Sequence, residues 1–108
     1  MKRLIHSSTS ILGMAVADKD SFNIPYDIWL DPAEHTRNVK HNMPRVKVDI
    51  GNERVPYFIS KEPRSLVKRK IKGESDIKKF VHKNYDKMIA HWNHEILDKD
   101  ILNELEPL

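Results

Sequence analysis

Apolar side chains recur every three or four residues between Gly73 and Leu97, as they do along one face of a helix. Ser75 is a suitable N-cap, and Asp76 lies in the first turn, where the helix dipole is positive. The pattern therefore predicts one long helix from Gly73 to Leu97. Its inner face consists of Ile77, Phe80, Val81, Tyr85, Met88, Ile89, Trp92 and Ile96.

A period of two predicts a β-hairpin in the middle of the chain. Residues 45–50 alternate apolar and polar side chains, and Gly51-Asn52 suits a two-residue turn with a positive φ at the glycine. Pro56 then falls at a non-hydrogen-bonded pair, so we expect the second strand to lie at a sheet edge, or its hydrogen-bond ladder on that side to be broken. The predicted register pairs Val48 with Val55 and Val46 with Tyr57 on the buried face. On the other face it pairs Arg45 with Phe58, and Asp49 with Arg54 as a favourable cross-strand charge pair.

The other segments have shorter patterns. We expect strands at 1–6, 11–17 and 26–31, with a turn at 7–10 and a polar connection at 18–23. A short helix from Asp31 is followed by a loop to Pro44, and residues 66–71 form a further strand or, as the alternative, an extended lead into the helix. A terminal helix begins at Asp98 or Asp100, with Ile101, Leu102 and Leu105 inward. Strands first and helices last predict a single α+β domain over residues 1–108. In it, an antiparallel sheet packs on one long C-terminal helix, with a short terminal helix beyond.

Composition limits the class of protein. The chain has no cysteine, so disulfides and thiolate metal sites are excluded and a reducing compartment is expected. No segment approaches the roughly 20 apolar residues that span a bilayer. We therefore expect a soluble, cytoplasmic protein that does not interact with membranes.

Charge is unevenly distributed along the chain. Residues 36–72 carry 11 basic and 3 acidic side chains, a net charge of +8, whereas residues 1–35 carry −2 and residues 73–108 carry −3. Such a basic middle predicts a face that attracts anions, although an ordinary solvated strand surface is the alternative. The candidate partner-binding residues are Arg45, Lys47, Arg54, Lys68, Arg69 and Lys70.

The chain's six histidines raise the question of a metal site. His91 and His94 lie three residues apart on the predicted helix and could share one ion, with His35 and His41 approaching from the loop. Spacing fixes no third ligand, and histidines near a helix C-terminus also suit the dipole there. We therefore predict no cofactor and keep zinc as an alternative.

No motif identifies a reaction. The serines lie in no nucleophile elbow. General acid–base catalysis needs only geometry, so a small ribonuclease built from His, Arg and Lys side chains stays open as the alternative enzyme.

Residues 41–48 (HNMPRVKV) resemble the strand motif H-x-P-P-H-x-H-V of a small bacterial and phage domain family of unknown function. The resemblance covers about residues 41–97 and includes the helix end His91-Trp92-Asn93. It implies a hairpin followed by a helix, and a prokaryotic or phage origin. Met43 replaces the first proline of the motif, and Arg45 and Lys47 replace its second and third histidines. Any metal or acid–base role of those histidines is therefore lost here.

These observations together predict a non-catalytic binding protein, encoded by a phage or mobile element and acting in the bacterial host cytosol. Its basic hairpin face would inhibit a nucleic-acid-targeting host machine such as a CRISPR effector, in the manner of anti-CRISPR proteins. The expected partner is an acidic protein surface on a nucleic-acid-binding effector, or nucleic acid bound without sequence specificity. The alternatives are a toxin-like ribonuclease and a histidine-rich zinc-binding interaction domain.

Overall fold

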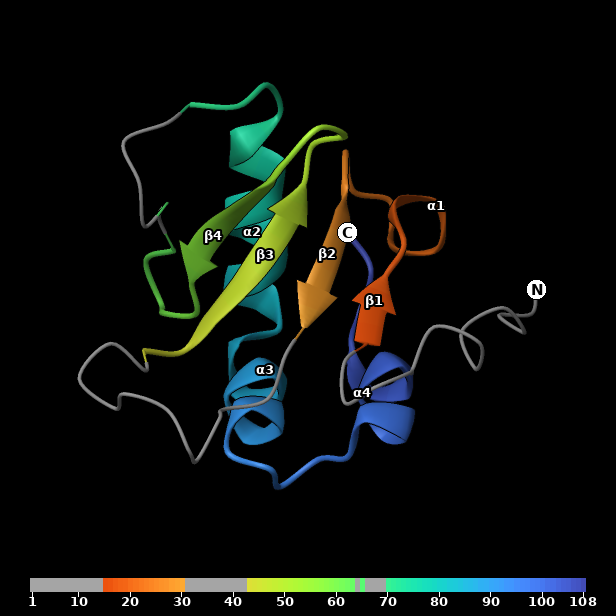
Figure 1. Ribbon diagram of the computed structural model, residues 1–108. Helices are drawn as coiled ribbons and strands as arrows, with labels where there is room; N and C mark the ends of the chain where they lie inside the picture. Colours follow the sequence, from red (N-terminus) through yellow and green to blue (C-terminus); the bar gives the residue numbers. More distant parts are fainter. Residues whose placement is uncertain (1–14, 31–42, 64, 66–69) are drawn as a thin grey trace.

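The computed structural model describes residues 15–30, 43–63, 65 and 70–108, and Figure 1 shows their arrangement. Its four strands form an antiparallel meander in the order β1-β2-β3-β4, with helices alongside, which confirms the predicted α+β class. The elements are β1 (Ala15–Ala17), α1 (Lys19–Phe22), β2 (Asp27–Leu30), β3 (Arg45–Asp49), β4 (Arg54–Phe58), α2 (Glu74–Lys83), α3 (Tyr85–Trp92) and α4 (Asp98–Glu104).

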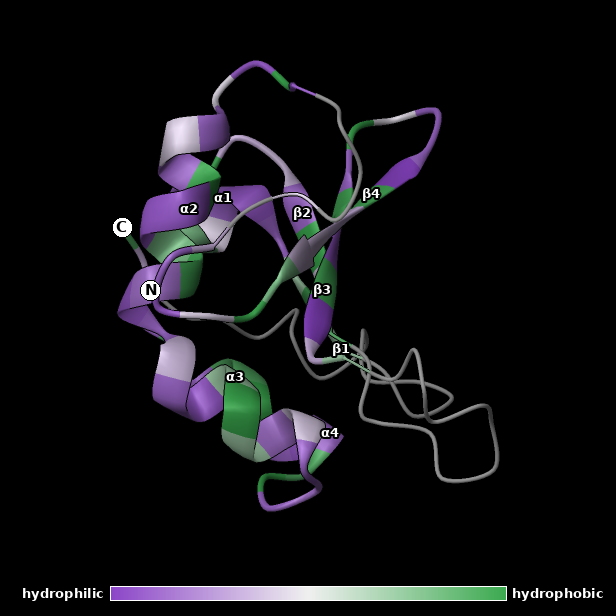
Figure 2. Ribbon diagram, turned by 90° about the vertical axis from the view of Figure 1, so that its left-hand side faces the viewer, coloured by the Kyte–Doolittle hydropathy of each residue, from purple (hydrophilic) through white to green (hydrophobic). Residues whose placement is uncertain are grey.

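The core lies between one face of the sheet and the helices. Helices α2 and α3 lie on the same side of the sheet in Figure 2, and α4 packs beside β1. Because side chains alternate along a strand, every second strand residue is buried against these helices. The buried strand residues are Ala15, Ala17, Ile28, Leu30, Val46, Val48, Val55 and Tyr57, and the helices contribute Ile77, Phe80, Val81, Met88, Trp92, Ile101 and Leu102.

The predicted hairpin register is confirmed in every pair, including Lys47 opposite Pro56. Gly51 has a φ of 110° in the turn. Backbone hydrogen bonds join Ile50 N–H to the Glu53 carbonyl and Ile59 N–H to the Pro44 carbonyl, both at 3.0 Å. Since hydrogen-bonded and non-hydrogen-bonded pairs alternate, Pro56 falls at a pair that needs no N–H.

Strand β4 lies at one edge of the described sheet, as Pro56 predicted, and β1 lies at the other. On its outer side, the described residues contribute an isolated bridge between Tyr57 and Ser65. The expected strand at 66–71 lies mostly outside the described residues, and Lys70 and Ile71 belong to no strand.

The single long helix expected from Gly73 to Leu97 is instead two helices, α2 and α3, which meet at Asn84. Asn84 is only 2% exposed and has a non-helical φ of −106°. Its side-chain amide donates to the carbonyls of Phe80 and Glu106, both at 3.0 Å, and its Oδ1 accepts from Glu106 N–H at 2.7 Å. Asn84 therefore ties the junction of the two helices to the C-terminal segment, an interaction that apolar periodicity cannot reveal.

The expected helix ends were also wrong. Gly73, with a φ of 80°, precedes the first helical residue, so Ser75 lies inside the first turn and does not cap it. Asp76 does lie in that turn. At the other end α3 stops at Trp92, five residues before the expected end at Leu97.

The expected polar connection at 18–23 contains the one-turn helix α1. The Asp18 carboxylate accepts from Ser21 N–H at 3.0 Å and caps the turn. Phe22 is fully buried and meets the Phe80 ring edge-on, with 5.7 Å between the ring centroids. Burial of this one aromatic ring explains why a polar segment folds onto the core.

The remaining expectations divide between confirmed elements and undescribed residues. Strands β1 and β2 lie within the expected strands at 11–17 and 26–31, and α4 begins at Asp98 with Ile101, Leu102 and Leu105 buried. The strand at 1–6, the turn at 7–10 and the helix and loop expected after Asp31 lie outside the described residues.

Tyr57 links the sheet to α2 from the buried face. Its hydroxyl donates to Glu74 Oε2 at 2.7 Å. Burial and, second, this hydrogen bond to a carboxylate raise the pKa of Tyr57 well above its ordinary value. The folded state therefore favours the neutral phenol.

Replacing Asn84 with alanine should lower the free energy of unfolding by about 1–3 kcal/mol, because the backbone groups of Glu106 lose their buried partner. Urea unfolding measures the change. Asn103→Ala, an exposed change on α4, is the matched control and should stay within about 0.5 kcal/mol of wild type. Equal effects of the two substitutions would contradict the role assigned to Asn84.

The free energy of unfolding should fall as pH rises above about 10, where tyrosine ionises in the unfolded chain. Folded Tyr57 keeps its proton beyond that pH because its pKa is raised, so unfolding releases a proton. Tyr57→Phe removes this contribution and should flatten the decline in denaturant unfolding curves measured between about pH 8 and about pH 10.5. An equally steep decline in the variant would show that other groups cause it.

Candidate anion-binding face

The outward side chains of the four strands form what we call the open face of the sheet. None of the described helices lies over this face (Figure 2). The strand register aligns Val16, Trp29, Lys47 and Pro56 in one row across all four strands. The full set is Val16, Asp27, Trp29, Arg45, Lys47, Asp49, Arg54, Pro56 and Phe58.

Arg54 and Trp29 form the closest cation–aromatic contact on the open face. The Arg54 Cζ atom lies 3.8 Å from the centroid of the Trp29 ring, so the side chain reaches from β4 across β3 to β2. Arg54 is an exposed residue, and Trp29 is partly buried. Among the residues that the structure describes, no carboxylate pairs with Arg54. Its positive charge is therefore held in place by an aromatic ring, without neutralisation by a described acid.

Asp49 holds the Trp29 ring from the side. Its Oδ2 accepts from the Trp29 indole Nε1–H at 3.3 Å, and its Oδ1 accepts from Gly51 N–H at 2.9 Å. Asp49 and Arg54 are opposite each other, as predicted, but they do not form the expected charge pair. Both oxygens of Asp49 already have donors, and Arg54 turns to the indole instead.

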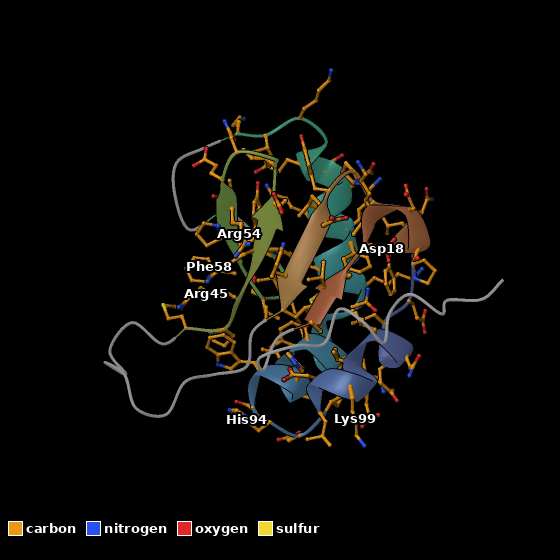
Figure 3. The ribbon with its side chains drawn as sticks, turned by 45° about the vertical axis from the view of Figure 1, so that its right-hand side comes forward. Asp18, Arg45, Arg54, Phe58, His94 and Lys99 are labelled. Carbon is orange, nitrogen blue, oxygen red and sulfur yellow. The ribbon has the colours of Figure 1, made fainter. Side chains whose placement is uncertain are left out.

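Arg45 lies at the other end of β3. Its Cζ atom is 5.6 Å from the centroid of the Trp92 ring, and its Nη1 donates to the Met43 carbonyl at 3.2 Å. Phe58 is its cross-strand partner. Figure 3 shows Arg54, Phe58 and Arg45 along the same side of the hairpin, so aromatic and cationic groups alternate there.

The strand register places Arg45, Lys47 and Arg54 at outward positions of the hairpin, as predicted from the strand pattern, and the Arg45 guanidinium reaches the Trp92 ring of α3. Lys70 is exposed and belongs to no strand. Lys68 and Arg69 lie outside the described residues, so their expected place beside the other cations stays a prediction.

Two carboxylates share this face with the cations. Asp27 lies directly opposite Asp49, an unfavourable arrangement for like charges. Backbone N–H groups offset the repulsion, because Asp27 Oδ1 accepts from Lys19 N–H at 2.8 Å and Asp49 accepts from Gly51. The acids are thus engaged with the backbone, while the hairpin carries three cations.

The histidines do not form the arrangement that spacing suggested. His91 is 2% exposed, and its Nε2 lies 2.6 Å from Asp98 Oδ1, which joins α3 to α4. His94 lies beyond the end of α3 with a φ of 65°, so the two are not neighbours on one helix face. In the described part of the chain, no group of three or more His, Cys, Asp or Glu side chains could hold a metal. His35 and His41 lie outside that part.

Trp29 belongs to the open face but is absent from the candidate residues predicted from the sequence. The alternation of residues 26–31 already places it outward, in line with Asp27. A large aromatic side chain at an outward strand position was the signal that could have identified it, because such positions usually carry polar residues.

Comparison with known proteins yields no relative: no protein-family model, no curated protein and no solved structure matches this chain. The resemblance of residues 41–97 to a phage domain family therefore stays a prediction. None of the helices in the described residues is long and apolar enough to cross a membrane.

A double-mutant cycle of Arg54→Ala and Trp29→Leu should give a coupling of about 0.5–1 kcal/mol in the free energy of unfolding, as expected for an exposed cation–aromatic contact. Denaturant unfolding of the four proteins measures it. Lys99→Ala, an exposed change on α4, should show no coupling to Trp29→Leu. Purely additive effects of the Arg54 and Trp29 changes would mean that the contact contributes nothing to stability.

Proposed function

We propose that this chain is a non-catalytic binding protein and that the open face is the surface with which it binds an anionic partner. One observation carries the proposal. The Arg54 guanidinium lies 3.8 Å from the centre of the Trp29 ring and has no described carboxylate as a partner.

The chemistry of arginine supports this assignment. A guanidinium can stack on an aromatic ring and still donate from its N–H edge to a carboxylate or a phosphate, which it matches in shape. The stacking also restrains the side chain, so less conformational entropy is lost when an anion binds. Arg54 is thus positioned for an anion before the partner arrives.

The hairpin that carries Arg54 has a well-determined strand register. Its register is set by the Gly51-Asn52 turn and by Val46, Val48, Val55 and Tyr57, which are all buried. Slipping by one residue would expose this whole set, so the positions of Arg45, Lys47 and Arg54 relative to one another are well determined.

The contacts of two described histidines do not favour the ribonuclease alternative. His91 is buried against Asp98, and the Nδ1 of His82 lies 2.7 Å from the Lys61 carbonyl. Both histidines have structural partners, and neither lies on a strand of the open face.

The narrower form of the proposal names the partner as a nucleic-acid-targeting effector, such as a CRISPR effector, that a phage or mobile-element protein inhibits. The open face would then dock on an acidic surface of the effector in the bacterial cytosol. The net charge of +8 over residues 36–72 is consistent with this, as is the small size of the chain. Recovery of one effector from cell lysate, both with and without nuclease treatment, is the expected result for this form.

Arg54→Glu should weaken binding to a fluorescent heparin oligosaccharide by about tenfold and lower the dependence of log affinity on log salt by about 1 or more. Fluorescence anisotropy at several salt concentrations measures both. The matched control is Lys99→Glu, which makes the same change in net charge on exposed α4, away from Arg54 in Figure 3.

Wild-type affinity in Arg54→Glu would refute the assignment of the open face. Equal losses in the two variants would show that net charge alone attracts the polyanion. The melting temperature of Arg54→Glu should stay within a few degrees of wild type, because an exposed contact of this kind contributes only about 0.5–1 kcal/mol.

A further inference from the structure

We propose that the anionic partner is a single-stranded nucleic acid, bound without sequence specificity, whose bases stack on the open face while its phosphates meet the cations. This inference rests on the proposed function, that the open face binds an anionic partner, and names the chemical class of the ligand. It competes with the narrower form of that proposal, in which the ligand is an acidic protein surface. A surface that bound only carboxylates would need cations alone, and the open face offers more than cations.

Flat and apolar side chains alternate with cations across the open face. Trp29, Lys47 and Pro56 follow one another in a single row from β2 to β4, and Arg45 lies opposite Phe58 in the next row. Trp29, Pro56 and Phe58 are all partly buried, so each keeps part of its surface exposed. A single strand of nucleic acid alternates in the same way between flat bases and charged phosphates, and aromatic side chains stack bases of any sequence.

Arg54 and Trp29 together form a stacking platform. The indole is held at its edge by Asp49, at 3.3 Å from Nε1, and carries the Arg54 guanidinium on its face. An unpaired base can stack on the guanidinium plane, as bases do on arginine in RNA complexes, while the guanidinium edge donates to a phosphate. The Trp29–Arg54 pair thus supplies both contacts that one nucleotide needs.

A single strand suits this face better than a duplex. In a duplex the bases are already stacked and only their edges are accessible, so contact with the bases needs an element that enters a groove. The open face is a sheet surface, and no described helix projects from it (Figure 2). Unpaired bases can lie directly on such a surface.

The test compares two fluorescent oligonucleotides of about ten nucleotides, an oligothymidylate and an abasic strand with the same number of phosphates. Wild-type protein should bind the oligothymidylate about tenfold or more tightly than the abasic strand, because each stacked base contributes to the affinity. Arg54→Glu should weaken binding to both strands. Lys99→Glu, with the same change in charge, should keep the preference for bases.

Arg54→Lys separates stacking from charge and guards against misfolding of the charge-reversed variant. It keeps the positive charge but removes the guanidinium plane. On our inference it weakens oligothymidylate binding several-fold and leaves abasic binding nearly unchanged. In a Trp92→Phe background, where Trp29 is the remaining tryptophan, oligothymidylate should quench the fluorescence and the abasic strand should not.

Other outcomes would overturn the inference. Equal affinity for the two strands, with both lost in Arg54→Glu, would mean that the face binds anions without stacking, and the proposed function would stand. Binding to polyglutamate and to neither oligonucleotide would assign the face to acidic proteins and also leave the proposed function standing. Failure to bind the oligonucleotides, heparin and polyglutamate alike would refute both proposals.

Discussion

The burial of only one face of the sheet is the constraint on which the rest of this structure depends. Side chains alternate between the two faces of each strand, so the buried residues of β1 to β4 all lie on the side that the helices cover. The other side carries no part of the described core. It can therefore hold charged and aromatic side chains such as Arg54 and Trp29 at little cost to stability, because packing does not dictate the residue there. One face thus serves folding, and the other is free of that constraint and is the face we propose for contact with a partner.

Asn84 fixes the junction of α2 and α3, the helices that lie over the buried face of the sheet. A polar side chain that is almost fully buried needs partners for both its donors and its acceptor, and Asn84 finds them in Phe80 and Glu106. The same contacts hold the C-terminal segment along the helices. Two further hydrogen bonds hold this segment: the Lys83 side chain donates to the Pro107 carbonyl at 2.8 Å, and Leu108 N–H donates to the Phe22 carbonyl at 3.0 Å. The end of the described chain is therefore tied to both α1 and α2.

On the open face, the choice of partner for Arg54 decides the chemistry. Had Arg54 paired with Asp49, the two charges would have neutralised each other and an anion would have gained little from approaching. Asp49 is instead engaged by the Trp29 indole and by the turn at Gly51, and Arg54 stacks on the ring. The three side chains come from three different strands, so this arrangement exists only when the sheet is assembled.

The sequence by itself determined the features that depend on neighbouring residues. These are the hairpin register from Arg45 to Phe58, its glycine turn, the inner face of the helices, and the outward placement of Arg45, Lys47 and Arg54. They could be predicted because backbone geometry repeats the direction of side chains every two residues in a strand and about every 3.6 residues in a helix. Contacts between distant residues were decided only by the tertiary structure. The apolar period continues through Asn84, but the helix is interrupted there. The partner of the Asn84 side chain is Glu106, which is far along the chain, so a local pattern could not predict the interruption. Likewise, the hairpin register correctly placed Asp49 opposite Arg54. Which group Arg54 contacts was decided by a strand outside the hairpin, β2, which carries Trp29.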